Sequence, residues 1–161
     1  MSIQVGENMP EGTLTIMGEE GPGPLTTDDL FKGKKVVLFA VPGAFTPACS
    51  AKHLPGFVAN SDAIKSKGVD AIGCLSVNDV FVMSEWGKAH GADSKVLMLA
   101  DGNADYVKKL GLDLDASGFG MGTRAERFAI IVENCKVLKI LRESVISEVK
   151  ESSAENMLEN L

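Results

Sequence analysis

Cys49 is the residue whose type and position most favour chemistry. It stands three residues after Thr46 in the stretch VPGAFTPACSAKHLPGF, behind a run of apolar residues. If Thr46 caps a helix that begins at Pro47, Cys49 takes the third helical position, where unpaired N–H groups and the helix dipole stabilise negative charge. A helix start therefore favours the thiolate. Many free cysteines are instead small buried hydrophobes, so the surroundings must decide between a filler and a nucleophile.

The surroundings of Cys49 favour the nucleophile. The loop before it is rich in proline and glycine, and it follows an apolar run, at the end of a strand where open α/β sheets carry their active sites. Far along the chain, GMGTRAERF places Arg124 and Arg127 before another apolar run. A guanidinium is always charged, so either arginine could hold a thiolate and a polar oxygen substrate together.

The elements that position these residues alternate between strand and helix. Continuous apolar runs indicate buried strands, and capping residues followed by mixed polar and apolar residues indicate helices. We expect strands at 13–17, 34–41, 69–77 and 95–100, a hairpin over 127–142, and helices near 27–30 and over 47–67, 80–90, 103–111 and 153–161. Pro55 and Gly56 predict a kink or break in the second helix. The order predicts one α/β domain over 1–161, a central mixed sheet flanked by helices.

Composition excludes several classes of function. The 161 residues carry a formal net charge of -6, which argues against general binding to nucleic acid or to an anionic membrane surface. No apolar run reaches the roughly 20 residues that a membrane helix needs. Three widely spaced cysteines make a poor disulfide framework and suit a reducing compartment, so we expect a cytoplasmic protein. No CxxC and no paired Cys/His spacing occurs, so no zinc site is expected.

The motifs together resemble a known family. VPGAFTPACSAKHLPGF, CLSVNDVFVMSEW and GTRAERF are similar to the peroxiredoxins, in the subfamily of peroxiredoxin 5 and the plant type II enzymes. The similarity runs from VGENMP to the final ENL, and P-x-x-x-T-x-x-C is its most specific part. The resemblance implies a thioredoxin-like fold, with TxxC where thioredoxin carries CxxC.

The resemblance also implies roles for individual residues. Cys49 is expected to be the peroxidatic cysteine, Pro42 to shield it, Thr46 to supply a hydroxyl and Arg124 to be the active-site arginine. A thiolate that attacks the O–O bond becomes a sulfenic acid and releases water or an alcohol. N–H groups of the first helical turn, Thr46 and Arg124 suit the stabilisation of the leaving oxygen. No metal and no organic cofactor is required.

Two routes could recycle the sulfenic acid. The C-terminal stretch VKESSAENMLENL lacks the resolving cysteine that peroxiredoxin 5 carries there, whereas Cys74 matches a second cysteine of the plant type II enzymes. Cys74 could resolve after local unfolding, since a disulfide needs Cα atoms within about 7 Å; burial in a central strand explains it equally well. Without Cys74 a small thiol must attack. The resemblance implies glutathione with glutaredoxin, and thioredoxin is the alternative.

Other residues were expected to support the site or a subunit contact. His53 shares a helix face with Cys49 and is interpreted as structural or as lying behind the site. Arg127, on the strand face opposite Arg124, could brace the site through a carboxylate such as Glu85, or form a surface ion pair. Trp86 and Phe45 suit a pocket wall or a subunit contact, and the resemblance implies a homodimer.

Two other functions are rivals to the peroxidase. A thiol–disulfide oxidoreductase of the thioredoxin type is disfavoured because it needs a second thiol one turn from the first. A peroxide sensor that passes its oxidation to a partner protein is the alternative without catalytic turnover. Steady peroxide consumption with a thiol donor would exclude the sensor.

Overall fold

The fold is built on one seven-stranded sheet, seen in a computed structural model that describes residues 1–161. The strand order is β2-β1-β5-β4-β3-β8-β9. The central strands β3, β4 and β5 are parallel, and β1 and β8 join this core antiparallel on its two sides. The predicted thioredoxin-like α/β fold with a mixed sheet is confirmed.

The strands of this sheet follow the apolar runs closely. Their bounds are β1 Thr13–Gly18, β2 Gly21–Thr26, β3 Lys35–Ala40, β4 Ala71–Ser76, β5 Leu97–Ala100, β8 Phe128–Glu133 and β9 Lys136–Arg142. Strand β2 was not among the predicted strands, because its sequence GPGPLT is rich in glycine and proline, as is typical of a turn. Proline is tolerated on an edge strand, where no partner needs its missing N–H, and β2 lies at the sheet edge.

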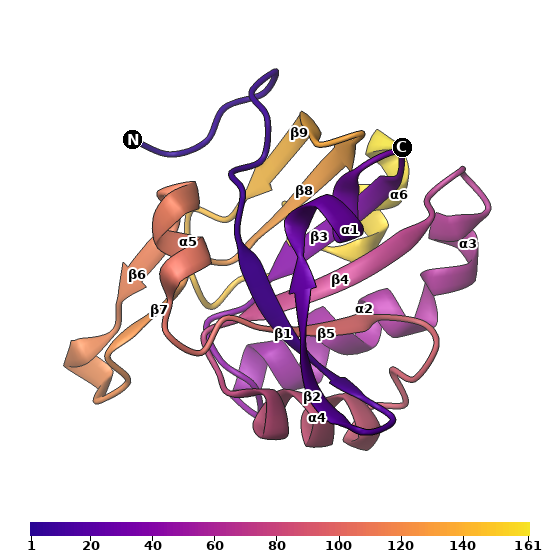
Figure 1. The fold of residues 1–161 in the computed structure, drawn as a ribbon. Coiled ribbons are helices and arrows are strands. Elements are labelled where there is room, and N and C mark those ends of the chain that lie inside the picture. Colours follow the sequence, from indigo (N-terminus) through magenta and orange to yellow (C-terminus); the bar gives the residue numbers. More distant parts are fainter.

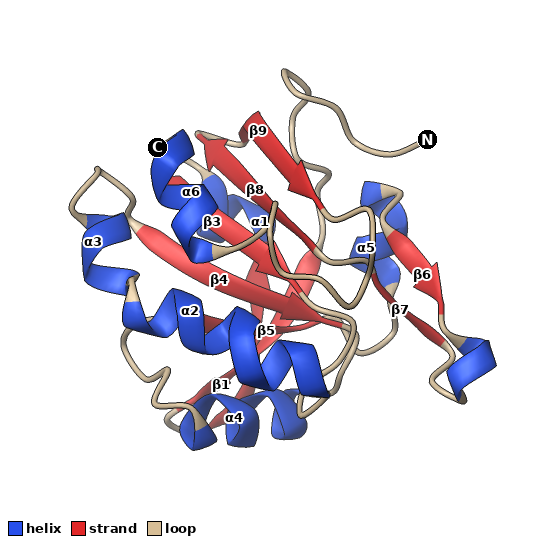
Figure 2. Ribbon diagram, turned by 180° about the vertical axis from the view of Figure 1, so that it is seen from behind, coloured by secondary structure: helices blue, strands red, loops and turns tan.

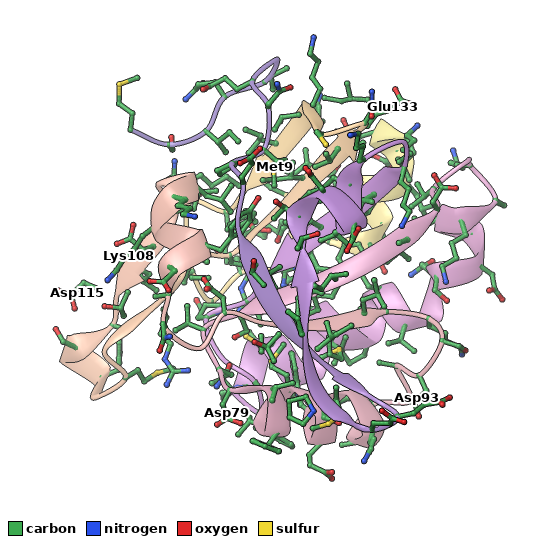
Figure 3. All side chains as sticks on the ribbon, in the orientation of Figure 1. Met9, Asp79, Asp93, Lys108, Asp115 and Glu133 are labelled. Atoms are coloured by element: carbon green, nitrogen blue, oxygen red, sulfur yellow. The ribbon has the colours of Figure 1, made fainter.

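Helices cover both faces of the sheet. Their bounds are α1 Thr27–Phe31, α2 Leu54–Ala59, α3 Ser61–Lys65, α4 Val80–Ala89, α5 Asp105–Leu110 and α6 Ala154–Asn160. Figure 2 shows α2, α3, α4 and α6 on one face, and Figure 1 shows α1 and α5 on the other. Asp79 caps α4 by accepting the Val82 N–H at 2.9 Å, and its side chain lies at the outer end of that helix (Figure 3). None of these helices has the length and apolarity to cross a membrane.

Each face of the sheet has its own apolar core. Cys49, Cys74 and Trp86 belong to the core beneath α2, α4 and α6, whereas Phe31 and Tyr106 belong to the core beneath α1 and α5. A separate small hairpin, β6 Asp113–Asp115 with β7 Thr123–Ala125, projects beside the main sheet (Figure 1). Asp115 lies at its outer end (Figure 3). This hairpin was not predicted from the sequence, because its three-residue strands are too short to show alternation.

Candidate active site

The candidate site lies in the loop that connects strand β3 to the following helix. Helical structure begins at Pro47, as predicted, and Cys49 in its first turn is fully buried. Phe45 has a φ of 63°, a left-handed conformation uncommon for an aromatic residue, and such backbone often marks functional loops. The loop therefore presents the first helical turn at the carboxyl end of the parallel strands, as expected of an α/β active site.

Thr46 holds this loop in a way that differs from a simple cap. Its carbonyl accepts the Ser50 N–H at 2.9 Å, but its hydroxyl donates to the Gly43 carbonyl at 2.6 Å instead of accepting from the helix. The expected side-chain cap is thus replaced by a loop hydrogen bond. The hydroxyl proton of Thr46 is donated to Gly43, so the lone pairs of the hydroxyl oxygen remain free to accept a hydrogen bond from a substrate O–H.

The helix carries its distortion before Pro55, not at the Pro55-Gly56 pair where the kink was predicted. Residues Cys49–His53 form a π-helical turn, in which the Leu54 N–H bonds to the Cys49 carbonyl. Proline has no N–H for the carbonyl four residues earlier and its ring collides with it, and a wider turn relieves both effects. Helix α2 continues to Ala59, and Asn60 interrupts the helix before α3 begins. Such π turns are frequent at functional sites.

The arginine on the sulfur is Arg127, which corrects the expected role of Arg124. Nη2 of Arg127 lies 3.0 Å from Cys49 Sγ, and the residue is 2% exposed. Arg124 instead donates from Nε to the Met121 carbonyl at 2.9 Å and from Nη1 to the Val77 carbonyl at 3.0 Å. Arg124 is therefore engaged with loop carbonyls, and no hydrogen bond joins it to the sulfur.

Strand register explains why Arg127 reaches the sulfur. Phe128 of β8 pairs with Ala40 of β3, so Arg127 lies beside the point where β3 leads into the Cys49 loop. Arg124 lies in β7, which pairs with β6 in the separate hairpin. Alternation could tell that the two arginines face different ways, but only the β3–β8 pairing tells which of them meets Cys49.

Arg127 has no carboxylate partner. Its Nε donates to the Ile146 carbonyl at 2.8 Å, and Nη1 lies 2.9 Å from His53 Nδ1. Glu85, the expected partner, is exposed and pairs with Lys88 at 3.3 Å, so that expectation was wrong. A buried charge without an opposite charge is costly, and the Cys49 thiolate is the anion that its position offers. The geometry thus places the Arg127 guanidinium where it can stabilise negative charge that develops at the sulfur.

His53 lies behind this pair, as one of the two interpretations of it proposed. An arginine only donates, so Nδ1 must accept from Arg127, and Nε2 then carries the proton and donates to the Ser152 carbonyl at 2.9 Å. Burial, and next to it the charge of Arg127, lower the pKa of His53 to about 3. Near neutral pH, His53 is therefore uncharged and holds Arg127 by a hydrogen bond. With so low a pKa it is too weak a base to take a proton from the substrate.

The neutral state of His53 predicts an acid-sensitive fold. Its pKa is lower in the folded protein than the unfolded value of 6.5, so its contribution is complete above about pH 6.5 and is lost as the pH falls towards 3. Between pH 6.5 and 5 we expect the free energy of unfolding to fall by roughly 1.5 kcal/mol. Urea unfolding across this range measures it. The variant His53→Gln, which cannot titrate, should be less stable at pH 7 but should lose this slope; an equal slope in both proteins would contradict the assignment.

An apolar cavity opens beside Arg127, the residue that contacts the sulfur. Its volume is about 550 Å³, and Pro42, Thr46 and Arg127 line it together. The other lining residues are mostly apolar: Pro47, Ala48, Ala51, Lys52, Leu114, Ala116, Phe119, Met121, Ile146 and Ser147. Pro42 and Thr46 were predicted to belong to the site, and the structure brings both to the cavity that Arg127 reaches.

The three cysteines are free and occupy different environments. Cys74 in β4 is fully buried in the same core as Cys49, and burial, followed by the proximity of Cys49, raises its pKa well above the ordinary value. Cys135 is partly buried and forms the β8–β9 turn with Asn134, both with positive φ. Trp86 is buried and donates to Ser50 Oγ at 3.0 Å, whereas Phe45 is 55% exposed.

Comparisons with known proteins agree with this geometry. The family model described as Redoxin matches residues 4–158. Peroxiredoxin-2B of Arabidopsis thaliana is 45% identical over 160 residues, which cover 99% of this chain and 98% of the relative.

Solved structures match over the same extent. Reduced Prx3 of Vibrio vulnificus in complex with hydrogen peroxide is 46% identical with a TM-score of 0.93, and the match covers 98% of both chains. The antioxidant protein of Plasmodium falciparum, a 1-Cys peroxiredoxin, is 31% identical with a TM-score of 0.91, again over 98% of both chains.

Proposed function

This chain belongs to the redoxin family and, within it, to the peroxiredoxins of the peroxiredoxin 5 and plant type II subfamily, and we propose that it reduces hydrogen peroxide and alkyl hydroperoxides and is recycled by glutathione with glutaredoxin. As a peroxiredoxin it is a thiol peroxidase whose peroxidatic residue is Cys49. The observation that carries the proposal is the 3.0 Å contact between Arg127 Nη2 and Cys49 Sγ, together with the open cavity that Arg127 also lines.

The chemistry follows from the groups around the sulfur. The thiolate attacks one peroxide oxygen, an S–O bond forms and the O–O bond breaks. The sulfur is oxidised to a sulfenic acid, and the departing oxygen takes a proton to leave as water or an alcohol. Negative charge develops on that oxygen, where a guanidinium donor stabilises the transition state. Thr46, whose lone pairs are available, is proposed to accept the peroxide O–H and to orient the O–O bond.

The cavity supports organic hydroperoxides among the substrates. A molecule of the size of water takes roughly 30 Å³, far less than the cavity of about 550 Å³. The remaining space is lined by apolar side chains, among them Leu114, Phe119 and Ile146. Such a surface suits an alkyl or aryl group better than water. Consumption assays with hydrogen peroxide and cumene hydroperoxide, each with glutathione and glutaredoxin, test the function. If neither peroxide is consumed, the proposed function is contradicted.

The environment of Cys74 supports an external reductant. A resolving thiol must be deprotonated to attack, and the raised pKa of Cys74 keeps it as a thiol in the core. Glutathione in a reducing compartment such as the cytoplasm can instead attack the sulfenic acid and release water. A second thiol then frees Cys49 from the mixed disulfide. Thioredoxin, with Cys74 resolving after local unfolding, is the competing scheme.

The two recycling schemes make opposite predictions for Cys74→Ala. We expect this variant to keep steady turnover with glutathione and glutaredoxin within about twofold of the original protein, because its sulfur takes no part in the cycle. Turnover assays with the glutathione and thioredoxin systems measure it, and Cys135→Ala is the matched control. Loss of turnover in Cys74→Ala alone, at unchanged peroxide reactivity of Cys49, would show that Cys74 resolves.

A homodimer is proposed on the basis of three exposed aromatic side chains, of which Phe45 and Phe119 lie at the site. The side chains are well exposed: 55% for Phe45, 62% for Phe81 and 83% for Phe119. Phe119 lines the cavity. The ring centroids of Phe45 and Trp86 lie 6.4 Å apart. Exposed aromatics of this kind are typical of interfaces. We expect sedimentation to give twice the chain mass and Phe119→Asp to weaken the dimer, with Leu138→Asp on β9 as the control. A monomer at all concentrations would contradict the proposal.

A further inference from the structure

The segment between β9 and α6 holds Arg127 from behind. The Ile146 carbonyl accepts from Arg127 Nε at 2.8 Å, and the Glu143 N–H donates to the Arg127 carbonyl at 3.1 Å. The Ser152 carbonyl accepts from His53, which in turn accepts from Arg127. Helix α6, which follows this segment, lies on the same face of the sheet as α2 (Figure 2). The segment thus contacts the active-site arginine both directly and through His53.

Glu143 gives this segment its shape. Its Oε2 accepts three hydrogen bonds, from the Lys150 N–H at 2.9 Å and from the N–H and hydroxyl of Ser152, each at 2.7 Å. Glu143 is 9% exposed and Ser152 is fully buried. Burial alone would raise the pKa of Glu143, but the donors from Ser152 and Lys150 outweigh it and lower the pKa overall. The carboxylate is therefore an ionised, nearly buried anchor.

Ser152 links Glu143 to the site, because its hydrogen-bonding groups bind two different partners. Its N–H and hydroxyl face Glu143, and its carbonyl faces His53 Nε2. Fixing that carbonyl fixes the proton on Nε2, and the lone pair of Nδ1 is then aimed at Arg127. A continuous series of hydrogen bonds runs from Glu143 through Ser152, His53 and Arg127 to the sulfur of Cys49.

We propose that Glu143 and Ser152 are positioning residues for the peroxide step, which hold His53 and through it keep the Arg127 guanidinium against Cys49. They touch neither the sulfur nor the cavity, and they act only through the arginine. The inference rests on the proposed peroxidase function for its effect on rate. Its effect on the sulfur itself can be measured without any peroxide.

The test compares Glu143→Ala, Glu143→Gln and Ser152→Ala with Glu151→Gln, a control that removes an exposed glutamate of the same segment. Two readouts are used: the rate constant for oxidation by hydrogen peroxide, and the rate of alkylation of Cys49 by iodoacetamide as a function of pH. By analogy with the hydrogen-bond partners of metal-bound histidines, whose loss costs roughly tenfold or more in activity, we expect a loss of about tenfold for Glu143→Ala. The glutamine variant, which keeps an acceptor oxygen, and Ser152→Ala should lose less.

The alkylation profile separates positioning from a simple charge effect. Removal of a nearby negative charge by itself favours the thiolate, so alkylation would begin at lower pH. A loosened Arg127 disfavours the thiolate, so alkylation would begin at higher pH. We expect the shift to higher pH for Glu143→Ala and no shift for Glu151→Gln. The titratable or charged groups around Arg127, the sulfur and the cavity, namely Arg127, His53, Cys74 and Lys52, all remain in these variants.

Each outcome decides the proposal. A shift to lower pH, or a lower melting temperature with an unchanged rate and profile, would overturn it and leave Glu143 as a loop anchor. If Glu143→Ala does not fold, Ser152→Ala decides, since it keeps the backbone groups and must slow oxidation and shift alkylation to higher pH. If the unaltered protein does not react with peroxide, the proposed function fails, while the alkylation profiles still decide this inference.

Discussion

Cys49→Ser is expected to abolish peroxide reduction, a loss on the order of a thousandfold or more in kcat/KM. The hydroxyl of serine is not ionised at neutral pH and cannot form a sulfenic acid, so the first step of the cycle has no nucleophile. The chain should still fold, because serine is close to cysteine in size. Consumption of hydrogen peroxide with glutathione and glutaredoxin measures the loss.

The other two cysteines supply the controls for this variant. Cys135→Ser changes a partly buried thiol in the β8–β9 turn and should leave the rate unchanged. Circular dichroism and the melting temperature must show that Cys49→Ser is folded. If the folded variant still consumed peroxide at a comparable rate, Cys49 would not be the nucleophile, and the assignment would fail.

Arg127→Ala is expected to slow oxidation of Cys49 on the order of a hundredfold, comparable with the loss of one oxyanion donor. The change removes the positive charge 3.0 Å from the sulfur and the donor that we propose for the leaving oxygen. It also leaves the Ile146 carbonyl and His53 Nδ1 without their partner, so stability should fall as well. Stopped-flow oxidation by hydrogen peroxide, well below the melting temperature, measures the chemical effect.

Arg124→Ala distinguishes the observed geometry from the earlier expectation. Arg124 binds the Met121 and Val77 carbonyls and should affect the rate much less than Arg127. Arg127→Lys keeps a charge but loses the planar fork that reaches sulfur, His53 and Ile146 at once, and it should recover only part of the rate. A greater loss in Arg124→Ala than in Arg127→Ala would show that the arginine roles have been exchanged.

Local sequence signals predicted the nucleophile and its helix well. The apolar run before the loop became β3, and Pro47 began the helix in whose first turn Cys49 lies. These features depend on neighbours along the chain, where capping and proline rules apply. The π-helical turn was missed because its cause, the missing N–H of Pro55, can be relieved either by a kink or by a wider turn.

Features that depend on distant pairing could not be read from the sequence. Arg124 and Arg127 are three residues apart in similar surroundings, and only the pairing of Phe128 with Ala40 brings Arg127 to the sulfur. Glu85 is suitably placed on α4 by pattern alone, yet it faces solvent and Lys88. The support for Arg127 comes instead from a loop after β9, with carbonyl groups that no side-chain pattern reveals.

Different observations disfavour the two rival functions: the missing second thiol for one and the open cavity for the other. A thioredoxin-like oxidoreductase would use a second thiol one turn from Cys49, but the residues three positions before and after it are Thr46 and Lys52. Failure to reduce insulin would agree with this, and rapid reduction would contradict it. A sensor would be oxidised once and would show no steady consumption with a thiol donor. The open cavity beside Arg127 suits repeated access of substrate.

The most direct test of the account is the intact mass of the reduced protein after one equivalent of hydrogen peroxide, with no thiol added. We expect the gain of a single oxygen atom, mapped to the peptide that contains Cys49, because the raised pKa of Cys74 keeps this neighbour of Cys49 protonated and unable to attack the sulfenic acid. An unchanged mass, or oxygen on another residue while Cys49 stays reduced, would contradict the claim that Cys49, held against Arg127, is the peroxidatic thiol.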